Sequence, residues 1–152
     1  MTVLEAADRH PWIAGVVGWV QLDDPPTAER RLDPRLCGVR HLVHDDPRDD
    51  FLLLSPVRRS LRRLAERGIP FDVPDAWPRH LAATAELAAA LPELRIVVDH
   101  LGKPPFGGED WERWRATLGA VAARPNTAAK VSGLQVPDRP FTVDEVRPAW
   151  EV

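Results

Sequence analysis

The sequence predicts an α/β fold in which about five parallel strands alternate with helices. Short apolar runs rich in valine recur along the chain, and amphipathic helical patterns separate them. The step from one run to the next is roughly 25 to 35 residues, which is typical of parallel βαβ units. A length of 152 residues is usual for one domain, so we expect residues 1–152 to form a single domain.

The strand predictions rest on β-branched apolar runs of strand length, most of which end at aspartate or proline. The first run is continuously apolar, which predicts a buried strand, and the residues 23–26 that follow it predict a loop. The five expected strands are Trp12–Leu22, Gly38–His44, Ile69–Val73, Arg95–Asp99 and Thr127–Ser132.

The helix predictions rest on apolar residues spaced three and four apart, which give each helix one buried stripe. Pro56 and Pro78 suit the first turns of two helices, and Gly68 suits a C-terminal cap. We expect the tryptophans of the last helix, Trp111 and Trp114, to pack in the core and not to stack on a ligand. The expected helices are Val57–Arg67, Arg79–Leu91 and Trp111–Ala123.

The composition indicates a cytoplasmic protein that binds neither nucleic acid nor membranes. The net charge is −3, and the arginines between Arg58 and Arg67 fall at helical spacing, which predicts a solvated helix face. No apolar run is long enough to cross a bilayer, and the first residues lack the pattern of a secretory signal. Cys37 is the single cysteine, so we expect no internal disulfide and interpret it as a small core residue.

Two architectures fit the alternation of strands and helices, an open doubly wound sheet and a (β/α)₈ TIM barrel. No glycine-rich phosphate loop opens any of the expected helices, and polar residues gather at the carboxyl ends of several strands, where barrel enzymes carry their sites. A full barrel needs about 250 residues. The chain begins in a helical pattern at Glu5–His10 and ends in another at Trp150–Val152. We therefore predict a partial barrel, truncated at both ends.

His100 is the first candidate for chemistry because it directly follows an expected strand and precedes a turn at Gly102. An imidazole there could polarise a carbonyl, transfer a proton or bind a metal, or it could simply bond to loop carbonyls. Strand alternation places Ile96, Val98 and His100 on one face and Asp99 on the other. Which face lines the lumen stays open.

Four further side chains are candidates for substrate binding. Arg40 and His44 share a face of the second strand, where Arg40 could bind a substrate carboxylate or ring oxygen, or pair with Asp45 or Asp72. Asp72 could orient a hydroxyl-rich substrate, or serve in a cap or loop bond. Lys103 could neutralise an oxyanion, although a loop contact with an acidic residue at 109–110 is the preferred interpretation.

The ordered segments resemble the amidohydrolase-related proteins typified by fuconolactonases and 2-pyrone-4,6-dicarboxylate lactonases. The resemblance runs from about Val3 to Trp150. It is carried by Gly15–Leu22, Gly38–Pro47, Gly68–Val73, Val97–Pro104 and Lys130–Leu134.

The resemblance implies a (β/α)₈ barrel that hydrolyses a sugar lactone or a similar small cyclic ester. It places His100 at the strand-end histidine that polarises the scissile carbonyl or helps to hold a metal, and it places Arg40 and His44 beside the substrate. The family's first-strand HxH pair and last-strand aspartate are absent from this sequence. We therefore expect weak or no activity from this chain alone. A divalent metal such as zinc, which full-length members could bind, is not expected to be held by it.

Two alternative functions remain. The first is a non-catalytic binding or assembly protein, a partial barrel that forms a homo-oligomer through its exposed sheet edges. The second is a metal-dependent decarboxylase of the same superfamily, which the missing HxH pair makes the weakest interpretation.

Overall fold

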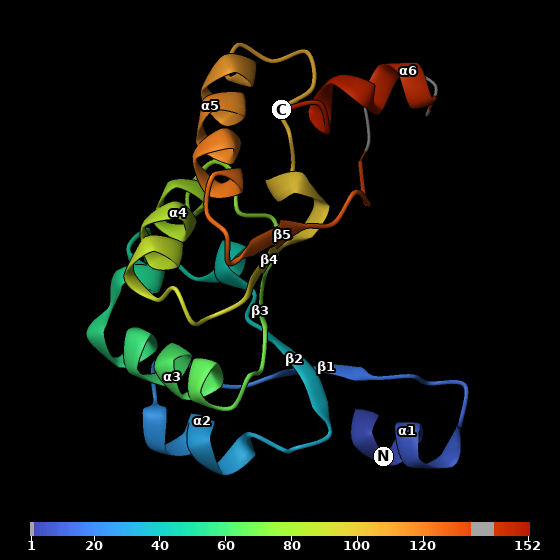
Figure 1. The fold of residues 1–152 in the computed structure, drawn as a ribbon, viewed down its shortest axis with the longest axis vertical. Coiled ribbons are helices and arrows are strands. Elements are labelled where there is room, and N and C mark those ends of the chain that lie inside the picture. Colours follow the sequence, from blue (N-terminus) through green and yellow to red (C-terminus); the bar gives the residue numbers. More distant parts are fainter. Residues whose placement is uncertain (1, 135–141) are drawn as a thin grey trace.

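Five parallel strands form one sheet in which the spatial order follows the chain, β1-β2-β3-β4-β5 (Figure 1). The structure is a computed structural model, and it describes residues 2–134 and 142–152. A doubly wound sheet would reverse its strand order at a switch point, whereas a barrel adds each strand beside the previous one. The observed order therefore selects the barrel. The strands are β1 (Val16–Trp19), β2 (Leu36–Arg40), β3 (Phe71–Val73), β4 (Ile96–Val98) and β5 (Thr127–Ala129).

All five predicted strands are present and each is shorter than predicted, and β2 is also displaced, because it begins at Leu36 and not at Gly38. The largest difference is in the first, where only residues 16–19 of the segment 12–22 pair with β2. The prediction that this strand is fully buried is wrong. Val16 is buried, whereas Val17 and Trp19 are 41% and 49% exposed because one face of β1 is open.

The helices are α1 (Val3–Arg9), α2 (Pro25–Arg31), α3 (Ser55–Glu66), α4 (Leu81–Ala90), α5 (Trp111–Ala122) and α6 (Val143–Val146). The three predicted central helices are confirmed as α3, α4 and α5, and the N-terminal helical pattern is confirmed as α1. The helical pattern predicted at Trp150–Val152 is wrong in position, because the helical turns end at Ala149 and residues 150–152 are not helical.

The loop predicted at residues 23–26 is shorter than expected, because it ends at Asp24 and helix α2 begins at Pro25. Asp24 caps this helix, since its Oδ1 accepts a hydrogen bond from the Thr27 amide at 3.2 Å, and Pro25 occupies the first turn. Pro56 and Gly68 stand where predicted, in the first turn of α3 and just past its end at φ +67°. Pro78 does not, because α4 begins only at Leu81.

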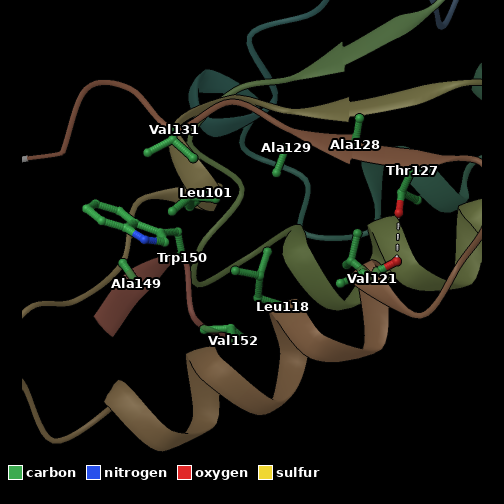
Figure 2. A pocket seen from close by; sticks show the side chains of 11 residues that line it. Leu101, Leu118, Val121, Thr127, Ala128, Ala129, Val131, Ala149, Trp150 and Val152 are labelled. Atoms are coloured by element: carbon green, nitrogen blue, oxygen red, sulfur yellow. Dashed lines mark hydrogen bonds between the residues drawn. The ribbon is translucent and has the colours of Figure 1, made fainter. Parts of the chain in front are cut away.

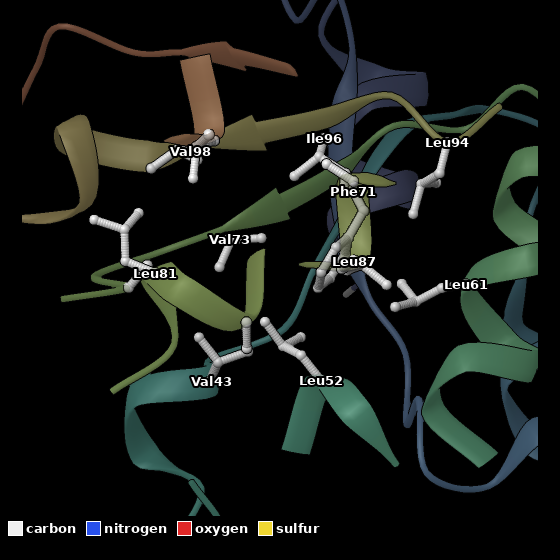
Figure 3. Packing of buried hydrophobic residues seen from close by; sticks show 14 of the residues in the cluster. Val43, Leu52, Leu61, Phe71, Val73, Leu81, Leu87, Leu94, Ile96 and Val98 are labelled. Carbon is white, nitrogen blue, oxygen red and sulfur yellow. The ribbon is translucent and has the colours of Figure 1, made fainter. Parts of the chain in front are cut away.

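The hydrophobic core lies between the sheet and the helices α2 to α5, which lie along one side of it (Figures 1 and 3). Strand register explains which side chains enter this core. Val39, Phe71 and Ile96 are aligned across β2, β3 and β4, and all three are completely buried. The neighbouring aligned row, which contains Arg40 and Asp72, therefore faces the other side of the sheet. That side corresponds to the lumen of a barrel.

Two sequence interpretations of core residues have opposite outcomes. Trp114 is completely buried and Trp111 packs partly buried against it, with ring centroids 4.8 Å apart, so these tryptophans are core residues as predicted. Cys37 is exposed, and its interpretation as a core residue is wrong. Within the described part of the chain, no helix is both long and apolar enough to cross a membrane.

Candidate active site

Four charged side chains meet on the open side of the sheet, at the carboxyl ends of four consecutive strands. Arg40 ends β2, Asp72 lies in β3, and Asp99 and Lys130 directly follow β4 and β5. Nη2 of Arg40 lies 2.7 Å from Oδ2 of Asp99 and 3.4 Å from Oδ2 of Asp72. Nζ of Lys130 lies 2.8 Å from Oδ1 of Asp99 and 2.5 Å from Oδ2 of Asp72. We call these four residues the charge cluster.

The charge cluster buries its acids and exposes its bases. The side chains of Asp99 and Asp72 are 0% and 4% exposed, whereas those of Arg40 and Lys130 are 39% and 42% exposed. Burial opposes the charge on Lys130, but hydrogen bonds to Asp72 and Asp99 outweigh that effect and raise its pKa. The cluster therefore presents two fixed positive groups to the open face.

A left-handed turn follows β4 and carries His100. His100, Leu101 and Lys103 have φ values of 56°, 51° and 66°, a conformation that side chains with a Cβ adopt only at an energetic cost. Gly102 continues the turn at φ +72°. Strand alternation ends at Asp99 for this reason, and the expectation that His100 continues the row of Ile96 and Val98 is wrong.

Hydrogen bonds from three other elements hold this turn. The amide of Leu101 donates to the carbonyl of Lys130 at 3.1 Å. The buried indole Nε1 of Trp114 donates to the carbonyl of Leu101 at 3.0 Å, and the Trp77 amide donates to the carbonyl of Gly102 at 2.9 Å. Strained backbone of this kind persists only where its surroundings over-determine it, and it is common at functional sites.

The imidazole of His100 lies against the segment that follows Lys130. Its Nδ1 is 2.9 Å from Oγ of Ser132, within hydrogen-bond distance. The ammonium group of Lys103 donates to the carbonyl of Gly133 at 3.2 Å, which ties the end of the turn to the same segment. The interpretation that Lys103 contacts an acidic residue at 109–110 is therefore wrong.

The structure brings some of the predicted site residues together and leaves one apart. Arg40 and Asp72 join the charge cluster, and His100 follows Asp99 directly in the chain. His44 does not join, because the strand ends at Arg40 and His44 lies in a short 3₁₀ helix, with Nε2 at 3.6 Å from Oδ1 of Asp45. The prediction that Arg40 and His44 share a strand face is wrong.

Asp99, Lys130 and Ser132 are candidate site residues that sequence reasoning did not select. Lys130 carried a signal, since Lys103 and Lys130 are the only two lysines in the chain and both stand beside strands. Asp99 was assigned to the face opposite His100, and nothing in the sequence shows that this face is the open one.

An apolar pocket of about 290 Å³ lies at the outer edge of β5 (Figure 2). Leu118 and Val121 of α5 form one wall, and Val131 and Trp150 lie on the opposite side. The one hydroxyl in its lining, that of Thr127, already donates to the carbonyl of Val121 at 2.8 Å. The pocket therefore has no side chain that could carry out acid–base chemistry, and the candidate site remains at the charge cluster.

Polar groups that converge at the carboxyl ends of parallel strands are typical of proteins with the (β/α)₈-barrel fold, of which this chain forms five strands. The chain belongs to the Amidohydrolase family, which it matches over residues 1–152. L-fucono-1,5-lactonase from Burkholderia ambifaria is 35% identical over 136 residues, which cover 87% of this chain and 47% of that protein. L-fucono-1,5-lactonase from Burkholderia multivorans is 33% identical over 141 residues, with the same coverage of 87% and 47%.

The crystal structure of an amidohydrolase from Burkholderia multivorans with bound zinc has the same fold. Its TM-score is 0.80 at 30% identity, and the similarity covers 98% of this chain and 55% of that one. The predicted family resemblance and the partial barrel are thus confirmed. The chain spans about half the length of the curated relatives that it matches.

Proposed function

We propose that this chain contributes the carbonyl-polarising and substrate-binding groups of a hydrolase that opens a small sugar lactone. The observation that carries the proposal is that His100 directly follows Asp99 of the charge cluster in the turn after β4, at the carboxyl ends of consecutive barrel strands. The 35% identity to an L-fucono-1,5-lactonase supports a lactone as the substrate class.

Lactone hydrolysis adds water to the carbonyl carbon and breaks the ring C–O bond, and the ring oxygen leaves as a hydroxyl group after it gains a proton. Negative charge develops on the carbonyl oxygen during the addition. The imidazole of His100 donates a hydrogen bond to that oxygen in this proposal. Arg40 and Lys130 offer fixed positive charge to the substrate, and Asp72 and Asp99 hold these cations in place.

Lys103 and His44 have smaller parts in the proposal. Lys103 stands at the end of the His100 turn, 3.2 Å from the Gly133 carbonyl oxygen, and could reach a substrate hydroxyl. His44 lies in the loop after β2 and contacts Asp45, so its role in substrate binding remains a prediction. The base that activates the attacking water is assigned to none of the described residues.

The related amidohydrolase from Burkholderia multivorans binds zinc, which raises the question of a metal at this site. Among residues 2–134 and 142–152, no three histidine, cysteine, aspartate or glutamate side chains converge to hold a metal ion. Asp72 and Asp99 are already neutralised by Arg40 and Lys130, which would repel a divalent cation. The described residues therefore do not fit a zinc site, and we derive no step through a metal.

Binding of an aldonolactam, a lactone analogue that resists hydrolysis, tests the proposal by titration calorimetry on the purified chain. We expect binding, and we expect His100→Ala to weaken it about tenfold, the free energy of about one hydrogen bond. His10→Ala, which removes an exposed histidine at the end of α1, is the matched control and should leave the affinity unchanged. Equal affinity of the His100→Ala variant and the wild type would contradict the proposal.

A further inference from the structure

Ser132 and Gly133 lie against one edge of the His100 ring. Oγ of Ser132 lies 2.9 Å from Nδ1 of His100, and it approaches the ring from beyond the end of β5. An imidazole has two ring nitrogens, so this contact occupies one and leaves Nε2 for a substrate.

Gly133 allows the imidazole to lie where it does. A Cβ added to this glycine would stand 2.5 Å from Nδ1 and 2.9 Å from Cγ of His100, closer than non-bonded atoms approach. Gly133 also has φ +58°, which favours glycine independently. The segment therefore fits closely around the ring, and any larger residue at 133 would displace it.

The backbone of His100 is fixed by separate contacts. Its φ of 56° belongs to the left-handed turn, and the next amide, that of Leu101, donates to the carbonyl of Lys130 at 3.1 Å. Lys130 and Ser132 thus hold the backbone and the ring of the same histidine from one short segment. Because the backbone and Nδ1 of His100 are both held, the ring presents Nε2 in one direction.

We propose that Ser132 is a positioning residue whose hydroxyl group donates a hydrogen bond to Nδ1 of His100 and so holds the neutral imidazole as the Nε2–H tautomer. This inference rests on the proposed function, because an Nε2–H group is what a lactone carbonyl oxygen accepts a hydrogen bond from. The opposite tautomer would present a lone pair, which repels that oxygen. Ser132 acts through His100 and does not itself contact the substrate.

The tautomer can be measured directly in the 152-residue chain by long-range ¹⁵N–¹H correlation NMR of the imidazole rings. The wild type should show His100 as the Nε2–H form. Ser132→Ala should give a mixture of tautomers, and Ser132→Thr, which keeps a hydroxyl group, should restore the single form. Gly133→Ala should also lose the single Nε2–H tautomer, because the added methyl group displaces the His100 ring.

The signals of His10, which lies at the far end of the sheet beyond β1, serve as an internal control in every variant. Backbone amide spectra that remain unchanged outside residues 99–103 and 130–134 establish that each variant is folded. An Nδ1–H tautomer in the wild type would overturn the inference, and so would a single Nε2–H form in folded Ser132→Ala.

Aldonolactam binding separates this inference from the proposed function. Ser132→Ala should weaken binding, and Ser132→Thr should restore it. If His100→Ala leaves lactam binding unchanged while Ser132→Ala still mixes the tautomers, the proposed function fails and the positioning role of Ser132 stands.

Discussion

The ammonium group of Lys130 lies 2.8 Å from the completely buried carboxylate of Asp99, and this ion pair joins the ends of neighbouring strands β4 and β5. Buried carboxylates are costly unless cations and hydrogen bonds compensate them. Two cations compensate the charge of Asp99, Arg40 on one side and Lys130 on the other. The pair therefore links the stability of the sheet to the shape of the candidate site.

Removal of the ammonium group should destabilise the chain. We expect Lys130→Met to lower the free energy of unfolding by about 1–3 kcal/mol, below the range for a fully buried pair because Lys130 is itself half-exposed. Urea denaturation measures the change. Lys103→Met is the matched control, since Lys103 is exposed and contacts only a carbonyl in the described structure. Equal effects of the two substitutions would argue against the cluster's structural role.

Substitution of Asn126 by aspartate should destabilise the fold strongly. Its Nδ2 donates to the carbonyls of Ala88, Leu91 and Leu94 at 3.1, 3.0 and 2.9 Å. Asn126→Ala loses these bonds and should cost about 1–3 kcal/mol. Asn126→Asp should cost more at pH 7, because a carboxylate would face three carbonyl oxygens. Thermal unfolding at pH 7 and pH 4 should show the gap between the two variants narrowing at low pH, as the introduced carboxyl becomes protonated.

Stability should fall as the pH decreases from about 7 to 5. Burial lowers the pKa of His41, and burial together with the charge of Arg79 lowers that of His80. The unfolded state therefore binds more protons in this window, and each histidine contributes a slope of at most about 1.4 kcal/mol per pH unit. The carboxylate of Asp33 stays ionised in this window, because hydrogen bonds from Arg35 lower its pKa to about 2.

Urea midpoints measured across this pH range test the histidine contribution. His80→Gln should flatten the dependence, because the substituted side chain does not titrate. His10→Gln, which changes a histidine exposed to solvent, should leave the slope of the urea midpoint against pH as it is in the wild type. A midpoint that stays constant from pH 7 to 5 in the wild type would contradict the prediction.

Trp114 should support the turn that carries His100. Trp114→Phe removes the donor to the Leu101 carbonyl and leaves that oxygen buried, so we expect a loss of about 1–3 kcal/mol. Trp111→Phe, which changes the partly buried neighbour of Trp114, should cost less. Differential scanning calorimetry gives both values. A smaller loss in Trp114→Phe than in Trp111→Phe would show that the indole hydrogen bond is unimportant.

The outer strands β1 and β5 have one neighbour each within the described sheet, and self-association through these edges remains a prediction. Light scattering after size exclusion should show a species larger than 17 kDa. Val17→Lys, which puts a charge on the edge strand β1, should shift the distribution toward the monomer, and Val3→Lys on α1 should not. A monodisperse wild-type monomer would count against the assembly alternative.

The sequence by itself determined the five strands, the helices α1, α3, α4 and α5, and their order, but it did not predict α2 or α6. Apolar runs such as Ile96–Val98 and stripes such as that of α3 are local patterns, with periods set by backbone geometry. Polar residues after the strands also indicated which edge carries the site, because parallel strands bring their carboxyl ends together. His100, Arg40 and Asp72 are candidate site residues for this reason.

Tertiary structure alone decided which face of the sheet is open and how the site residues pair. Alternation divides a strand into two faces without saying which one the helices cover, so Asp99 could not be assigned to the lumen from its position. The left-handed turn at His100 depends on donors from Trp114 and Trp77, which are distant in the chain. Such contacts have no local sequence signal, because each residue alone would also fit an ordinary core or loop.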